Sequence, residues 1–216
     1  TPKGREDFID ALASLLKREL HWDLGPENIA VSNGSQSAFF ILLNMFSGRY
    51  PDGSIKKVLF PVNPEYIGYA DQGIYESSFV SRKPKIELID DHFFKYHIDF
   101  DSLTLSDDIS AVCVSRPTNP TGNVITDEEL KKLDRLCVQR NIPLIVDNAY
   151  GAPFPQIIFA DVNPIWEEHI IYTMSLSKLG LPSTRTGIII ACKEVIEAIS
   201  ACNAIFSLSN TSIGQV

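Results

Sequence analysis

The order of hydrophobic and polar residues predicts helices that alternate with strands. Residues 5–20 repeat apolar side chains at helical spacing, and residues 126–140 open with Thr126 followed three positions later by Glu129, the signature of a helix capping box. Further helices are expected from the turn at residues 33–37 through Met45, over residues 64–73 and over residues 193–204. Short apolar runs predict buried strands at residues 29–31, 57–61, 78–81, 109–115, 143–147, 170–174 and 187–191.

Two segments lack such a pattern. Residues 82–108 are polar and are expected to cross the surface, with at most one short strand, and residues 153–164 have the composition of a loop. Strands that are apolar throughout and alternate with helices are typical of a sheet covered on both faces. The predicted fold class is therefore α/β, a three-layer αβα sandwich with a mostly parallel sheet, in one domain. Because the chain starts at Thr1 rather than at methionine, we expect residues 1–216 to be a piece of a longer protein.

Charge and cysteine content narrow the possible partners. The net charge is −8 and no block of lysine or arginine is present, which argues against nucleic acid and anionic membrane surfaces as partners. No apolar run is long enough for a membrane span. The four cysteines and four histidines show no metal-ligand spacing, so we expect reduced thiols, no metal site and a cytoplasmic protein.

A lysine closely follows one of the most apolar strands. Lys178 comes four residues after the run 170–174 and is preceded by Ser175 and Ser177. A lysine at the end of a buried strand is costly unless it has a partner or a task. One such task is imine formation with an aldehyde cofactor, because a partly desolvated amine loses its proton more easily.

Other polar groups also follow the ends of predicted strands, where ligands bind in open α/β sheets. They are Gly34-Ser35-Gln36, Asn119, Asp147 with Tyr150, Ser175 with Lys178, and Arg185. Taken singly each has an ordinary explanation: a helix cap for the glycine turn, a turn residue for Asn119 and a loop-bracing carboxylate for Asp147. Together they favour a ligand site, with the start of the helix after Gly34 suited to an anion.

The motifs Asn119-Pro-Thr-Gly122, Asp147-x-x-Tyr150 and Ser175-Leu-Ser-Lys178, with Arg185 beyond them, resemble the signature set of class I/II aminotransferases, which are fold-type I enzymes dependent on pyridoxal 5'-phosphate (PLP). The resemblance runs over nearly the whole chain. It implies that Lys178 holds PLP as an internal aldimine and that Asp147 pairs with the pyridine nitrogen. It further implies that Tyr150 and Asn119 bond the phenolic oxygen of PLP and that Tyr66 stacks on its ring.

The same resemblance assigns the phosphate of PLP to Gly34, Ser35, Gln36, Ser175 and Arg185. It implies ping-pong transfer of an amine between an amino acid, valine or alanine, and a 2-oxo acid, pyruvate or 2-oxoisovalerate. It also implies a cytoplasmic homodimer. Residues 1–216 would be the PLP-binding large domain, without the small C-terminal domain that carries the substrate-carboxylate arginine of the family.

One feature departs from the family pattern, and three alternatives share the cofactor residues. Arg185 lies seven residues after Lys178 where the family usually has eight, and Pro182 stands where an aliphatic residue is common. The alternatives are a PLP-dependent C–S lyase, a cyclopropane-carboxylate synthase and a non-catalytic PLP-sensing domain of a transcription regulator.

Overall fold

The computed structural model describes residues 1–216, which form two compact units. The first unit contains Thr1–Leu42, Asn148–Phe159 and Asn163–Val216. The second contains Leu43–Asp147 and Ala160–Val162. Each unit has its own strands and helices.

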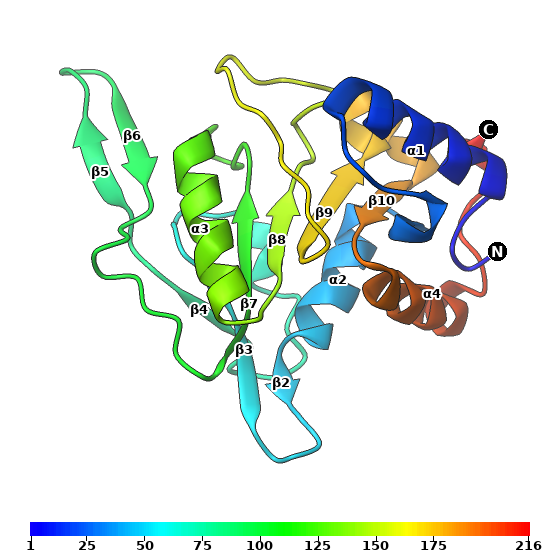
Figure 1. Cartoon of the computed structure of the whole chain (residues 1–216), viewed down its shortest axis with the longest axis horizontal. Helices are drawn as coiled ribbons and strands as arrows, with labels where there is room; N and C mark the ends of the chain where they lie inside the picture. Colours follow the sequence, from blue (N-terminus) through cyan, green and yellow to red (C-terminus); the bar gives the residue numbers. More distant parts are fainter. The chain divides into compact units, whose positions relative to one another are not determined.

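The first unit is built on three buried strands. Its strands are β1 (Ile29–Ser32), β9 (Ile170–Ser175) and β10 (Gly187–Ile190), and every residue of the three is buried. Its helices include α1 (Glu6–Leu20), the start of α2 (Ser35–Met45) and α4 (Lys193–Ser207). Helices α1 and α4 both contact β1, and Figure 1 shows them above and below β10. All of these elements were predicted, with boundaries within three residues.

Strand β10 runs antiparallel to both of its neighbours, β9 and β1, so this part of the sheet differs from the mostly parallel arrangement that was predicted. The reason lies in the short link between β9 and β10. It holds only the 3-10 turns η3 (Leu176–Leu179) and η4 (Pro182–Thr184). A parallel return needs a crossover of a dozen or more residues, and a link without a crossover helix brings the next strand back antiparallel.

The second unit has the parallel arrangement that was expected. Strands β3 (Ile55–Phe60), β7 (Ile109–Ser115) and β8 (Leu144–Asp147) pair in parallel in the order β3-β7-β8, and β4 (Phe79–Ser81) also runs parallel to β3. The two-residue strand β2 (Gly48–Arg49) is antiparallel to β3. Helix α3 (Asp127–Gln139), green in Figure 1, contacts β8. Thr126 caps it, and the predicted capping box with Glu129 is confirmed.

The helix predicted over residues 64–73 is wrong. Only one 3-10 turn forms there, η2 (Ile67–Tyr69), and Tyr66 before it has an extended ψ of 121°. The segment contains Gly68 and Gly73, which favour an irregular backbone over a helix, and Ile67 is 81% exposed, so no apolar stripe holds the segment against the core.

The polar segment 82–108 holds two strands rather than at most one. Strands β5 (Lys85–Leu88) and β6 (Phe94–His97) form an antiparallel hairpin whose turn is closed by Asp90, which accepts hydrogen bonds from the backbone N–H groups of His92 and Phe93. The sequence pattern did not predict this hairpin because the apolar side chains of β5 and β6 face solvent.

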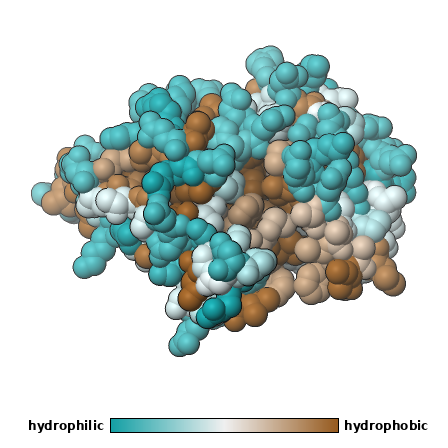
Figure 2. Space-filling view, turned by 60° about the horizontal axis from the view of Figure 1, so that its bottom comes forward, coloured by the Kyte–Doolittle hydropathy of each residue, from teal (hydrophilic) through white to brown (hydrophobic).

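Hydrophobic side chains reach the surface in several places, as the brown areas in Figure 2 show for one face. Large exposed ones cluster on the hairpin, at Ile86, Leu88, Phe93 and Phe94, and around the end of α4, at Ile205, Phe206, Leu208 and Ile213. Exposed apolar groups of this kind often mark contacts with further protein. None of the helices has the length and apolar character that crossing a membrane requires.

Candidate functional site

The predicted site residues divide between the two units. The first unit carries Gly34, Ser35, Gln36, Tyr150, Ser175, Lys178 and Arg185. The second carries Tyr66, Asn119 and Asp147.

In the first unit, Arg185 lies against the start of α2. An ideal Cβ added to Gly34 would lie 2.2 Å from Nη2 of Arg185, so the guanidinium group occupies the space that any side chain at Gly34 would fill. Gly34 has φ +89° and directly precedes Ser35, the first residue of α2. A helix start presents free N–H groups and a partial positive charge. With a guanidinium beside them, these N–H groups form a site suited to a phosphate.

The two 3-10 turns explain how Arg185 reaches this place although it lies only seven residues after Lys178. Arg185 ends η4 in the left-handed conformation, with φ +49°. Its Nη1 is 3.5 Å from Oγ of Ser177, and Ser177 was not among the predicted phosphate residues. Ser175, which was, is buried, and its Oγ accepts the backbone N–H of Ser177 at 3.1 Å. Gln36 is exposed on the first turn of α2.

Lys178 is exposed rather than buried. Strand β9 ends at Ser175, and η3 carries the lysine out of the strand and into solvent. Its Nζ lies 5.1 Å from the centre of the Tyr150 ring, close enough for a cation–π contact. Lys178 and Tyr150, which the family motifs place around PLP, are therefore neighbours in this unit.

In the second unit, Asp147 ends β8 and accepts a short hydrogen bond from Tyr69. The phenol donates to Oδ2 of Asp147 over 2.6 Å, and the same hydroxyl lies 3.0 Å from Oγ of Ser115. Ser115 and Asp147 are directly paired at the carboxyl ends of β7 and β8. A carboxylate that accepts a hydrogen bond is stabilised in its ionised form.

A second carboxyl group lies beside this pair. Oε1 of Glu65 accepts the backbone N–H of Ser115 at 2.9 Å. Burial, with a further contribution from the charge of Asp147, raises the pKa of Glu65 to about 7. Burial also raises the pKa values of Tyr69 and Cys113 well above their usual values, so both are uncharged at neutral pH.

The remaining predicted residues, Tyr66 and Asn119, are at least partly exposed to solvent. Tyr66 packs edge-to-face against Tyr69, with ring centres 5.4 Å apart, and is partly exposed. Asn119 is exposed in the turn that follows β7, where the backbone N–H of Gly122 bonds the carbonyl of Thr118 at 2.7 Å.

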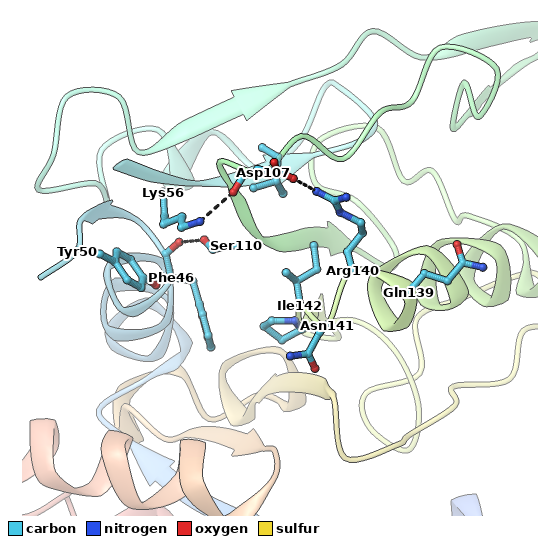
Figure 3. A pocket seen from close by; sticks show the side chains of 11 residues that line it. Phe46, Tyr50, Lys56, Asp107, Ser110, Gln139, Arg140, Asn141 and Ile142 are labelled. Atoms are coloured by element: carbon cyan, nitrogen blue, oxygen red, sulfur yellow. Dashed lines mark hydrogen bonds and ion pairs between the residues drawn. The ribbon is translucent and has the colours of Figure 1, made fainter. Parts of the chain in front are cut away.

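A cavity of about 610 Å³ in the second unit lies at the other end of its strands. Figure 3 shows its lining, where Lys56 Nζ bonds the carbonyl oxygen of Asp107 at 2.8 Å and Arg140 pairs with the Asp107 carboxylate. Its lining includes the amino ends of β3 and β7 and the link from α3 to β8, whereas Ser115 and Asp147 lie at the carboxyl ends of their strands. Arg140 is therefore paired with a carboxylate, whereas Lys56 bonds an uncharged backbone carbonyl oxygen.

Comparison with known proteins identifies the family. The family model for aminotransferase class I and II matches residues 1–215. The chain belongs to the class I and II aminotransferases. It is 57% identical over 213 residues to the valine–pyruvate aminotransferase of Escherichia coli K12, a match that covers 99% of this chain and 51% of that protein. The chain therefore spans about half the length of this relative.

Solved aminotransferase structures have the same fold. A putative amino-acid aminotransferase from Psychrobacter arcticum superposes with a TM-score of 0.95 at 46% identity, covering 99% of this chain and 52% of that one. The valine–pyruvate aminotransferase of Salmonella typhimurium superposes with a TM-score of 0.91 at 57% identity, covering 99% of this chain and 53% of that one. These similarities confirm the predicted α/β three-layer class of this aminotransferase chain, with a mixed, mostly parallel sheet.

Sequence reasoning missed Glu65, Tyr69, Ser115 and Ser177 as members of the two clusters. Ser177 had a signal, its position one residue before Lys178. The other three had none, because nothing in the sequence shows that an irregular segment after β3 reaches the ends of β7 and β8.

Proposed function

We propose that residues 1–216 are the PLP-binding large domain of an aminotransferase that transfers an amine between an amino acid and a 2-oxo acid. The observation that carries the proposal is the placement of an anion site, made by Arg185 and the start of α2, in the same unit as the Lys178 amine. The 57% identity to a valine–pyruvate aminotransferase supports valine or alanine as donors and pyruvate or 2-oxoisovalerate as acceptors.

The residues at the start of α2 fit the phosphate of PLP in charge. Gly34, Ser35, Gln36, Ser175 and Arg185 would hold its phosphate, since the Gly34 turn leaves room for a guanidinium that a side chain would exclude. When bound, PLP supplies an aldehyde and an electron-withdrawing ring that stabilises negative charge at the substrate Cα.

The other residues would orient the ring and move protons. Lys178 would bond PLP covalently, and its Nζ, once released by the substrate amine, would take the proton from the substrate Cα. Asp147 would keep the pyridine nitrogen protonated, while Tyr150 and Asn119 would donate to the phenolic oxygen. Tyr66 would cover one face of the ring.

Assembly and location belong to the same proposal. We propose a cytoplasmic homodimer whose polypeptide also includes a small domain with the substrate-carboxylate arginine. The apolar side chains exposed on the β5–β6 hairpin and around the end of α4 support contact with further protein.

The alternatives share the cofactor residues but differ in product. A C–S lyase would release ammonia and pyruvate, whereas an aminotransferase conserves the amine. A cyclopropane-carboxylate synthase would close a ring within its substrate and transfer no amine to a 2-oxo acid, and a PLP-sensing domain of a transcription regulator would bind PLP without turnover. The 57% identical relative favours transamination over all three.

Replacing the lysine tests the proposal directly. Borohydride reduction of the PLP-loaded protein should fix the cofactor to Lys178 in the wild type and in the matched control Lys131→Ala, whose lysine is exposed on α3. Mass spectrometry of Lys178→Ala should find no such adduct, and amine exchange should fall by about 10²-fold or more because the positioned base is lost. If Lys178→Ala kept the visible absorbance band of bound PLP and exchanged amines at an undiminished rate, the proposal would be wrong.

A further inference from the structure

The fold holds Tyr69 rigidly beside Asp147. Tyr69 ends η2, is 3% exposed, and stacks on Phe60 with ring centres 5.4 Å apart and ring planes 16° apart. Its backbone N–H donates to the carbonyl of Tyr66 at 3.1 Å, and its carbonyl accepts the N–H of Gln72 at 3.0 Å. Because ring and backbone are both fixed, packing rather than Asp147 sets the place of the phenol hydroxyl.

This hydroxyl is a lasting hydrogen-bond donor to Asp147. The two oxygens are 2.6 Å apart, and an ionised carboxylate can only accept, so the hydrogen comes from Tyr69. Burial, and after it the charge of Asp147, raises the pKa of Tyr69 well above its usual value, so the phenol keeps its hydrogen at neutral pH. Oγ of Ser115 lies 3.0 Å from the phenol oxygen and gives it a second neighbour in the same unit.

A fixed donor has two effects on a carboxylate. The terminal torsion of an aspartate is broad, so a hydrogen bond from a rigid partner restricts the directions that the carboxylate oxygens take. A hydrogen bond to the ionised form also lowers the proton affinity of the carboxylate. A carboxylate of lower proton affinity leaves a shared proton more fully on the base that faces it.

We propose that Tyr69 is a positioning residue that fixes the Asp147 carboxylate and lowers its proton affinity, so that the proton between Asp147 and the pyridine nitrogen of PLP stays on the nitrogen. The proposal rests on the proposed function for the identity of the group that Asp147 faces. The sequence motifs that assign Asp147 to the ring assign no task to Tyr69.

The first test follows the titration of Asp147 in the apo-protein. The aspartate carboxyl groups carry ¹³C, and Asp147→Asn identifies the resonance of Asp147. In Tyr69→Phe the titration midpoint of Asp147 should lie about 1–2 pH units above that of the wild type, because a hydrogen bond to a charged acceptor is lost. The ring that stacks on Phe60 is retained in this variant, so the protein should fold.

Tyr50→Phe is the matched control. It also loses a phenol hydrogen bond in the second unit, to the carbonyl of Met45 at 3.0 Å, but at the cavity on the other end of the strands. It should leave the Asp147 midpoint unchanged. Glu65 and Cys113 also interact with the charge of Asp147, and since neither is substituted in these proteins, their effects cancel in the comparison.

The second test uses protein loaded with PLP that carries ¹⁵N in its ring. In Tyr69→Phe the ring ¹⁵N resonance should move toward the position of an unprotonated pyridine, because Asp147 takes a larger share of the proton. In Tyr50→Phe it should stay at the wild-type position. A variant that merely bound less PLP would give a weaker resonance at an unchanged position.

The two measurements separate this proposal from the proposed function. An Asp147 midpoint in Tyr69→Phe equal to that of the wild type, or an unmoved ring ¹⁵N resonance, would overturn the role of Tyr69. Absence of a borohydride adduct at Lys178 in the wild type would instead contradict the proposed function, and the apo-protein titration would still decide whether Tyr69 sets the proton affinity of Asp147.

Discussion

The close approach of Arg185 to Gly34 predicts a selective effect of one added methyl group. In Gly34→Ala the new Cβ would lie 2.2 Å from Nη2 of Arg185, far inside van der Waals contact. Arg185 is exposed, so its guanidinium can swing away, and the protein should fold. The guanidinium would then leave the start of α2, where the phosphate of PLP is proposed to bind.

Backbone strain and the loss of a hydrogen bond to phosphate both contribute to the effect of Gly34→Ala, and a variant at a second glycine separates them. An alanine at φ +89° costs about 1–3 kcal/mol of backbone strain wherever it occurs. Gly53 has a similar φ of +85° with nothing within 4 Å of its added Cβ, so Gly53→Ala carries the strain without the clash. Only Gly34→Ala should also lose the charged hydrogen bond from Arg185 to phosphate, about 1.5–3 kcal/mol, or about 10- to 150-fold in Kd.

The assay is a titration of each apo-protein with PLP, alongside urea denaturation. Both variants should lose similar stability. Only Gly34→Ala should bind PLP more weakly than the wild type, by about 10- to 150-fold in Kd. Equal PLP affinities in Gly34→Ala and Gly53→Ala would refute the assignment of Arg185 to the phosphate site.

Two further predictions concern stability, measured by urea denaturation. Arg116 is buried and pairs with Asp127, so Arg116→Met should cost about 3–5 kcal/mol of unfolding free energy by leaving a carboxylate without its cation. Arg140→Met, at an exposed pair, should cost no more than about 1 kcal/mol. Equal losses in the two variants would show that burial does not set the cost. Thr126→Ala should cost about 1 kcal/mol of unfolding free energy because Thr126 caps α3. The control Thr104→Ala, at an exposed threonine, should cost nearly nothing. A Thr126 variant as stable as the wild type would mean that the cap contributes little.

The buried elements were predictable because their own side chains determine them. The apolar run 109–115 became β7 residue for residue, and the capping box at Thr126 set the start of α3 as expected. The segments that failed are those whose structure does not depend on burying a regular stripe. The helix expected over 64–73 has its apolar Ile67 in solvent, and the β5–β6 hairpin exposes its own apolar side chains.

The sequence by itself determined the family and the positions of Lys178, Asp147 and Arg185, because these are properties of residue order. Only the tertiary structure decided that the Arg185 guanidinium lies over Gly34 and that Lys178 stands exposed on a 3-10 turn. The same holds for the hydrogen bond from Tyr69 to Asp147, whose partners are 78 positions apart in the sequence. Hydrogen bonds act over about 3 Å, so residue order cannot reveal them until the fold brings the groups together.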